Sequence, residues 1–167
     1  MSVHDFWTPF AMFPFMNALI IGLSLASIWL VAALGLTIIY GTMGVINMAH
    51  GEFIMLGAYS TYVLQTFLGI PFLLCLPLTF LILAGIGWLI ERGIIRTLYE
   101  RPLDTLLATW GLSLILIQSV RLIFGGKPQY VAVPDWLKFN IDISFLHLSG
   151  VRLFVFGASI LILAITW

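Results

Sequence analysis

The stretch LTIIYGTMGVINMAHGEF, residues 36–53, places an asparagine, a histidine, a glutamate and three glycines between two apolar segments. Water is scarce at membrane depth, so broken backbone and ionisable side chains persist there only where protein buries them or a wet cavity receives them. We interpret residues 41–52 as a glycine-broken joint between the first two membrane helices. This pattern favours a solute pathway over a simple membrane anchor.

The composition also predicts an integral membrane protein. Of the 167 residues, 62% are hydrophobic and 8% are charged, whereas about one-quarter of the residues in soluble domains are charged. The seven basic and seven acidic side chains balance, and they form no basic run. Nucleic acid is therefore not an expected partner, because binding to its phosphates requires clustered positive charge.

Charged residues divide the chain into five apolar segments, which predict an all-α, polytopic membrane protein with four to five transmembrane helices. A helix needs about 20 residues to cross the hydrocarbon core. The second segment reaches that length only by including part of the joint, and the last one is short. The expected spans are residues 15–40, 47–68, 72–90, 105–124 and 153–167, with the last span truncated at Trp167.

The charged segment 91–104 sets the expected orientation. It contains Arg92, Arg96 and Arg101, and arginine-rich short loops are typical of the cytoplasmic side. Alternation then places the joint inside, and the N-terminus and residues 125–150 outside. We expect residues 125–150 to form an ordered loop with a short hairpin or an interfacial helix. The three arginines can equally be a solvated charged surface.

Three polar residues of the joint are candidates for the pathway. Asn47 is expected either to cap the following helix, with Glu52 near the positive end of that helix, or to contact solute. His50 is expected either to donate a hydrogen bond between helices or to relay protons. The spacing spreads Asn47, His50 and Glu52 around a helix and supplies no further ligand, so we expect no metal site and no catalytic residue.

The predicted fourth span carries further polar candidates. Thr109 and Ser113 share one helical face, where they can contact a solute or bond to the preceding turn. Gln118 is costlier to leave unpaired and is expected to have a polar partner. Small residues favour close helix packing or hinge movement, and we expect these roles for Gly22, Ala26, Ala33, Thr37, Gly41, Gly44 and Gly51.

The motifs INMAHGE (46–52) and MLGAY (55–59) resemble the membrane permeases of branched-chain amino acid ABC importers. The segment RPLDTLLATWGLSL (101–114) is similar to the urea-transport branch of that family, and PDWL (134–137) fits the same branch. The resemblance covers essentially the whole chain. Family members continue into further spans and a coupling loop, so residues 1–167 are expected to be the N-terminal part of one permease transmembrane domain.

The resemblance implies a multi-pass subunit of the bacterial inner membrane, surrounded by lipid. Its implied partners are a second homologous permease, two cytoplasmic ATPase subunits and an external solute-binding protein. The sequence contains no glycine-rich phosphate loop with Lys and Ser/Thr. ATP and magnesium are therefore expected on the ATPase partners, and this chain is expected to be a transport subunit without a cofactor or an enzymatic activity.

The implied mechanism is alternating access for a small-molecule solute. The scarcity of deep charges favours urea or a short amide, because leucine or valine would bring an ammonium and a carboxylate. The alternative is a branched-chain amino acid permease. A passive solute channel, a non-transporting membrane assembly protein and an intramembrane enzyme are the other classes considered.

Overall fold

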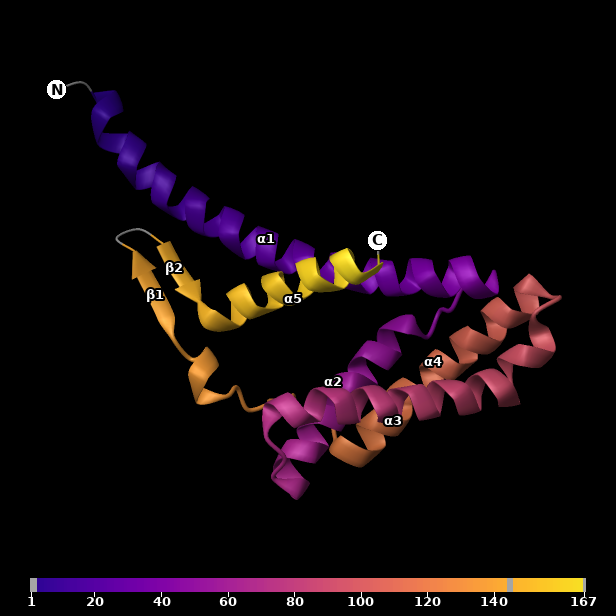
Figure 1. Cartoon of the computed structure of the whole chain (residues 1–167). Helices are drawn as coiled ribbons and strands as arrows, with labels where there is room; N and C mark the ends of the chain where they lie inside the picture. The colour runs from indigo at the N-terminus through magenta and orange to yellow at the C-terminus, as the bar shows by residue number, and fades with distance from the viewer. Residues whose placement is uncertain (1–2, 144–145, 167) are drawn as a thin grey trace. The chain divides into compact units, whose positions relative to one another are not determined.

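The computed structural model describes residues 3–143 and 146–166, and within them the fold is helical with one short hairpin (Figure 1). It confirms the predicted all-α, polytopic class. Its elements are α1 (Val3–Met43), α2 (His50–Leu68), α3 (Phe72–Gly93), η1 (Ile95–Leu98), α4 (Pro102–Phe124), η2 (Asp135–Leu137), β1 (Asn140–Ile143), β2 (Leu146–Ser149) and α5 (Gly150–Thr166).

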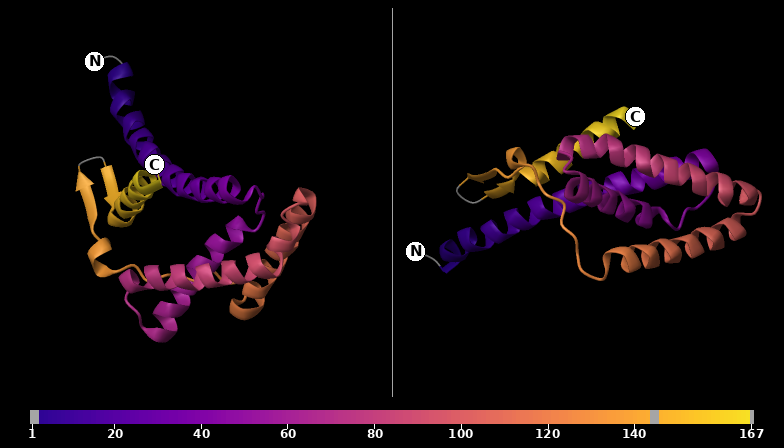
Figure 2. Two further views of the ribbon diagram at one scale, coloured as in Figure 1. Left: turned by 45° about the vertical axis from the view of Figure 1, so that its right-hand side comes forward. Right: turned by 90° about the horizontal axis from the view of Figure 1, so that it is seen from below.

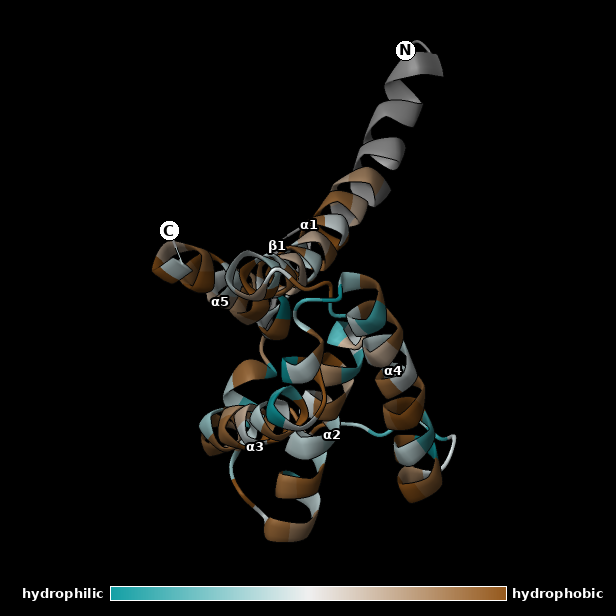
Figure 3. Cartoon of the chain, turned by 90° about the vertical axis from the view of Figure 1, so that its right-hand side faces the viewer, coloured by the Kyte–Doolittle hydropathy of each residue, from teal (hydrophilic) through white to brown (hydrophobic). Residues whose placement is uncertain are grey.

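Among the described residues, three helical segments are long and apolar enough to cross a membrane by themselves: Ala18–Met43, Phe72–Gly93 and Pro102–Phe124. Figure 3 shows hydrophobic residues along α3 and α4 and hydrophilic residues in the segment that leads into α4. The helix α2 has 19 residues and α5 has 17, close to the roughly 20 that a crossing needs. Trp167, the expected end of the last span, lies outside the described residues.

Three helix boundaries differ from those of the predicted spans. The helix α2 begins at His50 and not at residue 47, because residues 44–49 are not helical. The helix α3 continues to Gly93, beyond the predicted end at residue 90. The helix α4 begins at Pro102, since proline lacks an N–H that the first turn would leave unbonded in any case.

The chain divides into two compact units, Leu36–Ala132 and the combination of Met1–Gly35 with Val133–Trp167. In the first of these units, α3 packs along α2 (Figure 2). A Cβ built on Gly57 would lie 3.2 Å from Leu83 Cδ1, and Thr61 Oγ1 lies 3.1 Å from Thr79 Oγ1. The two helices therefore approach at a small residue and share a buried hydroxyl contact.

The turn between α2 and α3 follows a common helix ending. Gly69 has φ +64°, and its N–H donates to the Gln65 carbonyl over 3.1 Å. A residue in the left-handed conformation after a helix is usually glycine, because a Cβ atom is sterically unfavourable at positive φ. Pro71 then precedes α3, so the chain reverses within a few residues.

The second unit contains a hairpin, one of the two alternatives predicted within residues 125–150. The strands β1 and β2 are antiparallel, with Asn140 opposite Ser149, and they lead directly into α5 (Figure 1). The N–H of Gly150 donates to the Phe139 carbonyl over 2.9 Å. In the same unit, Ser159 Oγ on α5 donates to the Ser27 carbonyl on α1 over 3.3 Å.

Candidate functional site

The joint between α1 and α2 is a short non-helical segment, as the sequence predicted. Gly44 has φ +66°, a conformation that other residues adopt only at a cost. Asn47 Oδ1 accepts a 3.0 Å hydrogen bond from the Ala49 N–H, and the Asn47 carbonyl accepts one from the His50 N–H over 3.3 Å. Asn47 thus forms a turn before the helix. The predicted N-cap role is wrong, because Ala49 occupies the N-cap position.

Two hydrogen bonds hold the joint and the start of α2 to α4. The Met48 N–H donates to Thr109 Oγ1 over 3.2 Å, and Ser113 Oγ donates to Glu52 Oε1 over 2.7 Å. In each pair the partners are 61 positions apart. The two contacts are four positions apart on both segments and have the same order along each, so the start of α2 and α4 run in the same direction here.

Thr109 and Ser113 lie on one buried face of α4, at 1% and 8% exposure. The sequence predicted that they share a face, but it gave no indication of the segment they contact. The structure brings Glu52, Thr109 and Ser113 together. It does not bring Gln118 to this site, because Gln118 lies on an exposed face of α4 and has no hydrogen-bond partner among the described residues.

A cavity of about 510 Å³ lies beside the Glu52–Ser113 contact. Glu52 Oε2 is buried and has no hydrogen-bond partner among the described residues. Arg121 and Lys127 also line this cavity. Within residues 3–143 and 146–166, neither cation forms an ion pair with a carboxylate.

The loop after α4 forms one wall of the cavity. Gln65 on α2 fixes the end of this loop, since its Nε2 donates to the Ala132 carbonyl over 3.1 Å and its Oε1 accepts from the Ala132 N–H over 2.8 Å. Tyr59 and Phe124 pack with their ring centroids 4.7 Å apart. The sequence did not indicate that Arg121 and Lys127 line the same cavity as Glu52, or that Gln65 contacts Ala132. The one available signal was Arg121, the basic residue in the last turn of α4.

A second cavity, of about 530 Å³, lies on another side of the joint. Asn47, His50 and Glu91 line it together with apolar residues such as Phe53 and Leu83. His50 therefore faces a different space from Glu52. No group of three or more His, Cys, Asp or Glu residues in the described part of the chain is placed to hold a metal ion.

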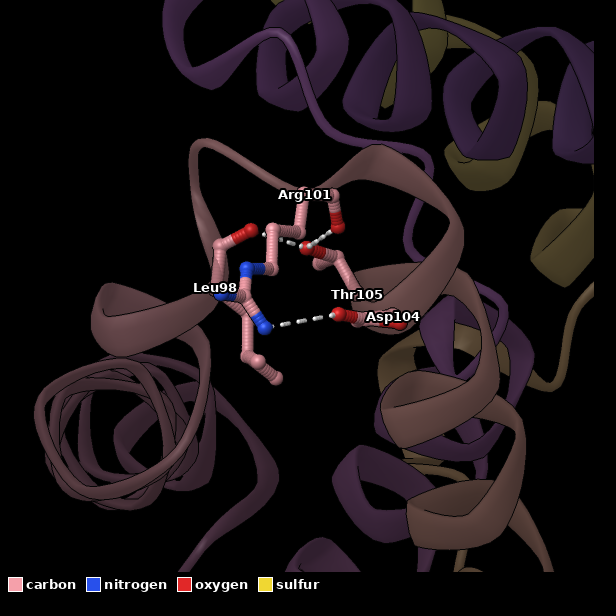
Figure 4. Close-up of polar contacts among 4 residues, drawn as sticks. All are labelled: Leu98, Arg101, Asp104 and Thr105. Carbon is pink, nitrogen blue, oxygen red and sulfur yellow. Dashed lines mark hydrogen bonds and ion pairs between the residues drawn. The ribbon is translucent and has the colours of Figure 1, made fainter.

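The predicted cytoplasmic segment is a tight, hydrogen-bonded connection. Arg92 lies over the Trp88 ring at 5.4 Å, Arg96 is exposed, and Arg101 pairs loosely with Asp104 at 3.7 Å. Thr105 is fully buried, and its hydroxyl contacts the Leu98 carbonyl at 2.7 Å and the Arg101 carbonyl at 3.0 Å (Figure 4). These contacts fix the entry into α4.

Tyr99 in the same connection donates a 2.9 Å hydrogen bond to Glu91 Oε1. Partial burial raises the pKa of the Tyr99 hydroxyl, and the hydrogen bond to Glu91 raises it further. Both effects favour the neutral phenol. The connection between α3 and α4 thus contains a polar contact that depends on a protonated tyrosine.

The small residues predicted for packing have varied surroundings. A Cβ built on Gly22, Gly41, Gly44 or Gly51 would meet no atom within 4 Å, so these glycines make no close helix contact within the described chain. Ala26 lines a groove between α1 and α5, and Ala33 and Thr37 lie on exposed parts of α1. Between α2 and α3 the closest glycine approach is instead at Gly57, near Leu83, with an ordinary contact between Gly87 and Phe53.

Comparisons with known proteins identify a family that covers most of the chain. Residues 18–167 match the family described as the permease component of the branched-chain amino acid transport system. No solved structure matches the chain with statistical significance.

Two relatives illustrate the similarity. The high-affinity branched-chain amino acid transport system permease protein BraD of Pseudomonas aeruginosa is 31% identical over 146 residues, which are 82% of this chain and 47% of that protein. LivH of Salmonella typhimurium, with the same system description, is 32% identical over 130 residues, covering 72% of this chain and 42% of that protein. The chain thus spans about half the length of the curated relatives it matches.

The names of these relatives support the branched-chain amino acid alternative better than the expected urea substrate, since neither name refers to urea. The family match covers most of the chain, including α2, α3 and α4. Together with its apolar helices, this match identifies a multi-pass protein of the inner membrane. The chain belongs to the family of permease components of branched-chain amino acid transport systems.

Proposed function

We propose that this chain is part of the permease subunit of a binding-protein-dependent ABC importer, and that it lines part of the path for branched-chain amino acids. The main support for this proposal is the Glu52–Ser113 contact, which lies beside a cavity in a chain of this family. Polar and charged groups between apolar helices are costly, and they usually mark a solute pathway. The branched-chain relatives supply the substrate class.

The chemistry of the cavity also favours an amino acid over urea. Urea is neutral and needs only paired donors and acceptors, whereas an amino acid carries one positive and one negative group. The cavity is lined by Glu52 and by two cations, Arg121 and Lys127. Charges of both signs therefore support a zwitterionic solute, in contrast to the sequence-based expectation of urea.

The proposed assembly contains a second homologous permease, two ATPase subunits and an external solute-binding protein. ATP binding and hydrolysis on the ATPases would shift the permease pair between outward-open and inward-open states. The joint at residues 44–49 is the proposed point of bending, since its backbone is not helical and Gly44 has a positive φ. The hydrogen bonds of Thr109 and Ser113 would then couple a movement of α2 to a movement of α4.

Uptake by cells tests this proposal. The complete gene would be disrupted, and uptake of labelled L-leucine and labelled urea would be compared before and after complementation. We expect leucine uptake to fall and urea uptake to remain unchanged. A fall in urea uptake alone would overturn the proposed substrate.

Reconstitution separates an ABC importer from a passive channel. The complete permease pair with its ATPases and binding protein would be placed in vesicles, and leucine entry would be measured with ATP and with a non-hydrolysable ATP analogue. We expect accumulation only with ATP. Equal leucine entry under both conditions would contradict the ABC mechanism.

A further inference from the structure

The helix α3 has an outer face that is exposed in the described chain. Its contacts with α2 are made through Thr79, Leu83 and Gly87. Residues three or four positions apart share one side of a helix, and four exposed residues at this spacing lie on the side away from α2: Leu81, Gly85, Trp88 and Arg92. We call these four residues the outer face of α3. In a membrane, this largely apolar surface lies against lipid or against another protein segment.

At the end of this face, Arg92 folds back toward the apolar part of α3. Its Cζ lies 5.4 Å from the centroid of the Trp88 ring, in a cation–π contact. The Trp88 side chain is 57% exposed, and exposed tryptophans of membrane helices are typical of the headgroup level. The contact therefore holds a guanidinium group at the depth of the lipid phosphates.

The charge of Arg92 has no ion-pair partner among the described residues. The neighbouring Glu91 accepts a hydrogen bond from Tyr99 and lines the second cavity together with residues of α2. Asp104 pairs with Arg101 instead. A lipid phosphate at this depth would supply the counter-charge, because a guanidinium group binds phosphate oxygens through two parallel hydrogen bonds.

The rest of the outer face fits an acyl chain better than another helix. Close contact between membrane helices favours small residues four positions apart, but the neighbours of Gly85 at that spacing are Leu81 and Leu89, which are 64% and 63% exposed. A Cβ built on Gly85 would meet no atom within 4 Å. The surface is therefore recessed between the large side chains of Leu81 and Trp88, and a flexible acyl chain can bury apolar surface in this recess.

We propose that the outer face of α3 binds an anionic glycerophospholipid. The Arg92 guanidinium contacts the phosphate, the Trp88 ring lies beside the glycerol region, and one acyl chain covers Gly85 and Leu81. A lipid with a net negative charge is favoured, because the headgroup of phosphatidylcholine brings its own cation next to Arg92. This inference goes beyond the proposed function, since it concerns a lipid partner and not the transported solute.

Photocrosslinking tests this assignment in the complete permease assembled with its partner subunits. The protein would be placed in phosphatidylcholine nanodiscs with a small, fixed fraction of photoactivatable phosphatidylglycerol or phosphatidylcholine, both carrying the same diazirine acyl chain. Mass spectrometry gives the crosslinked fraction of residues 81–92. One basic side chain near the membrane surface changes the binding of an anionic lipid by about fivefold. We therefore expect phosphatidylglycerol to label this segment about fivefold more than phosphatidylcholine.

Arg92→Gln distinguishes a lipid contact from a structural role at the helix end. Glutamine keeps a polar side chain at an exposed position but removes the charge, so labelling by phosphatidylglycerol should fall about fivefold, to the level of phosphatidylcholine. A purely structural role would change labelling by both lipids alike. Arg101→Gln is the matched control, because Arg101 belongs to the same connection but pairs with Asp104. It should leave the preference unchanged.

Equal labelling by the two lipids in the unsubstituted protein would overturn the proposal, and so would a preference that persists in Arg92→Gln. An equal loss of preference in Arg92→Gln and Arg101→Gln would assign it to the charge of the whole connection and not to the outer face of α3. Absence of labelling at residues 81–92, with crosslinks on other exposed helices, would show that a protein segment covers this face in place of lipid.

Discussion

Ser113 on α4 donates a 2.7 Å hydrogen bond to Glu52 on α2, at the same sequence offset as the contact between Thr109 and Met48 one turn earlier. Two contacts with one offset fix the register of the two segments. Sliding α2 by one residue along α4 would break both hydrogen bonds. Sliding of α2 along α4 is therefore opposed by both contacts.

Removal of the Ser113 hydroxyl tests the energetic importance of this register. Ser113→Ala leaves Glu52 Oε1 without its donor, and a buried acceptor that loses its partner costs about 1–3 kcal/mol. The free energy of unfolding in mixed micelles should fall by that amount. Ser119→Ala is the control on the same helix, because the Ser119 hydroxyl bonds only to the Ile115 carbonyl in its own helix. An equal loss in both variants would show that the contact with Glu52 adds no stability.

Gly150 should tolerate no larger side chain. A Cβ there would lie 2.6 Å from the Leu137 carbonyl oxygen and 2.8 Å from the Phe139 ring. Gly150→Ala should lower the free energy of unfolding by about 1–3 kcal/mol, as overpacking in a tight core does. Protease cleavage near residues 134–150 should become faster.

Gly157→Ala is the matched control on α5. A Cβ at Gly157 meets no atom within 4 Å, so alanine should stabilise the helix by about 0.5–1 kcal/mol through its better helix propensity. Similar destabilisation by both substitutions would refute the steric explanation for Gly150.

Gly44→Ala should disturb the joint through backbone strain. At φ +66° a Cβ costs about 1–2 kcal/mol even though the surrounding space is open. We expect the substitution to lower both the unfolding free energy and the rate of leucine transport. Gly41→Ala, in the adjacent helical turn and also in open space, should preserve the transport rate and should not lower the unfolding free energy. Transport by the Gly44 variant at the original rate would argue against a hinge at this residue.

The ionisation of Tyr99 should depend on Glu91. The pKa of Tyr99 is raised by burial and by the hydrogen bond to Glu91. The folded protein therefore retains the phenol proton more strongly than the unfolded chain does. This contribution to stability is complete below the unfolded pKa of about 10 and is lost as the pH rises through the folded value. Ultraviolet titration should show a lower Tyr99 pKa in Glu91→Gln, with Tyr99→Phe identifying the signal; an unchanged pKa would contradict the role of Glu91.

The sequence predicted the helical class and the joint because both follow from local patterns. A long apolar run and a cluster of Gly, Asn, His and Glu are visible without knowledge of the fold. Residues 44–49 are indeed non-helical, although α2 begins at His50 and not at residue 47. The residue at which a helix begins depends on the backbone conformation of single residues, which composition does not determine.

The partners of the polar residues were not predictable in the same way. The spacing of Thr109 and Ser113 shows that they share a helical face, but it carries no information about a segment 61 residues earlier. Gly22 and Gly41 fit the small-residue pattern but have open surroundings, whereas Gly57 and Gly87 lie against α3 and α2. Helix packing depends on which faces meet, and one sequence does not specify this choice.

The Gln65 side chain pairs with Ala132 as one peptide unit pairs with another, since its amide both donates and accepts. The loop after α4 is thereby attached at its far end to the last turn of α2, while it remains covalently continuous with α4. A displacement of this loop therefore acts on both helices. It acts on α4 through the covalent chain and on α2 through the two hydrogen bonds of Gln65. The amide of Gln65 thus links this loop to the end of α2, in addition to the contacts of Met48 and Glu52 that join the start of α2 to α4.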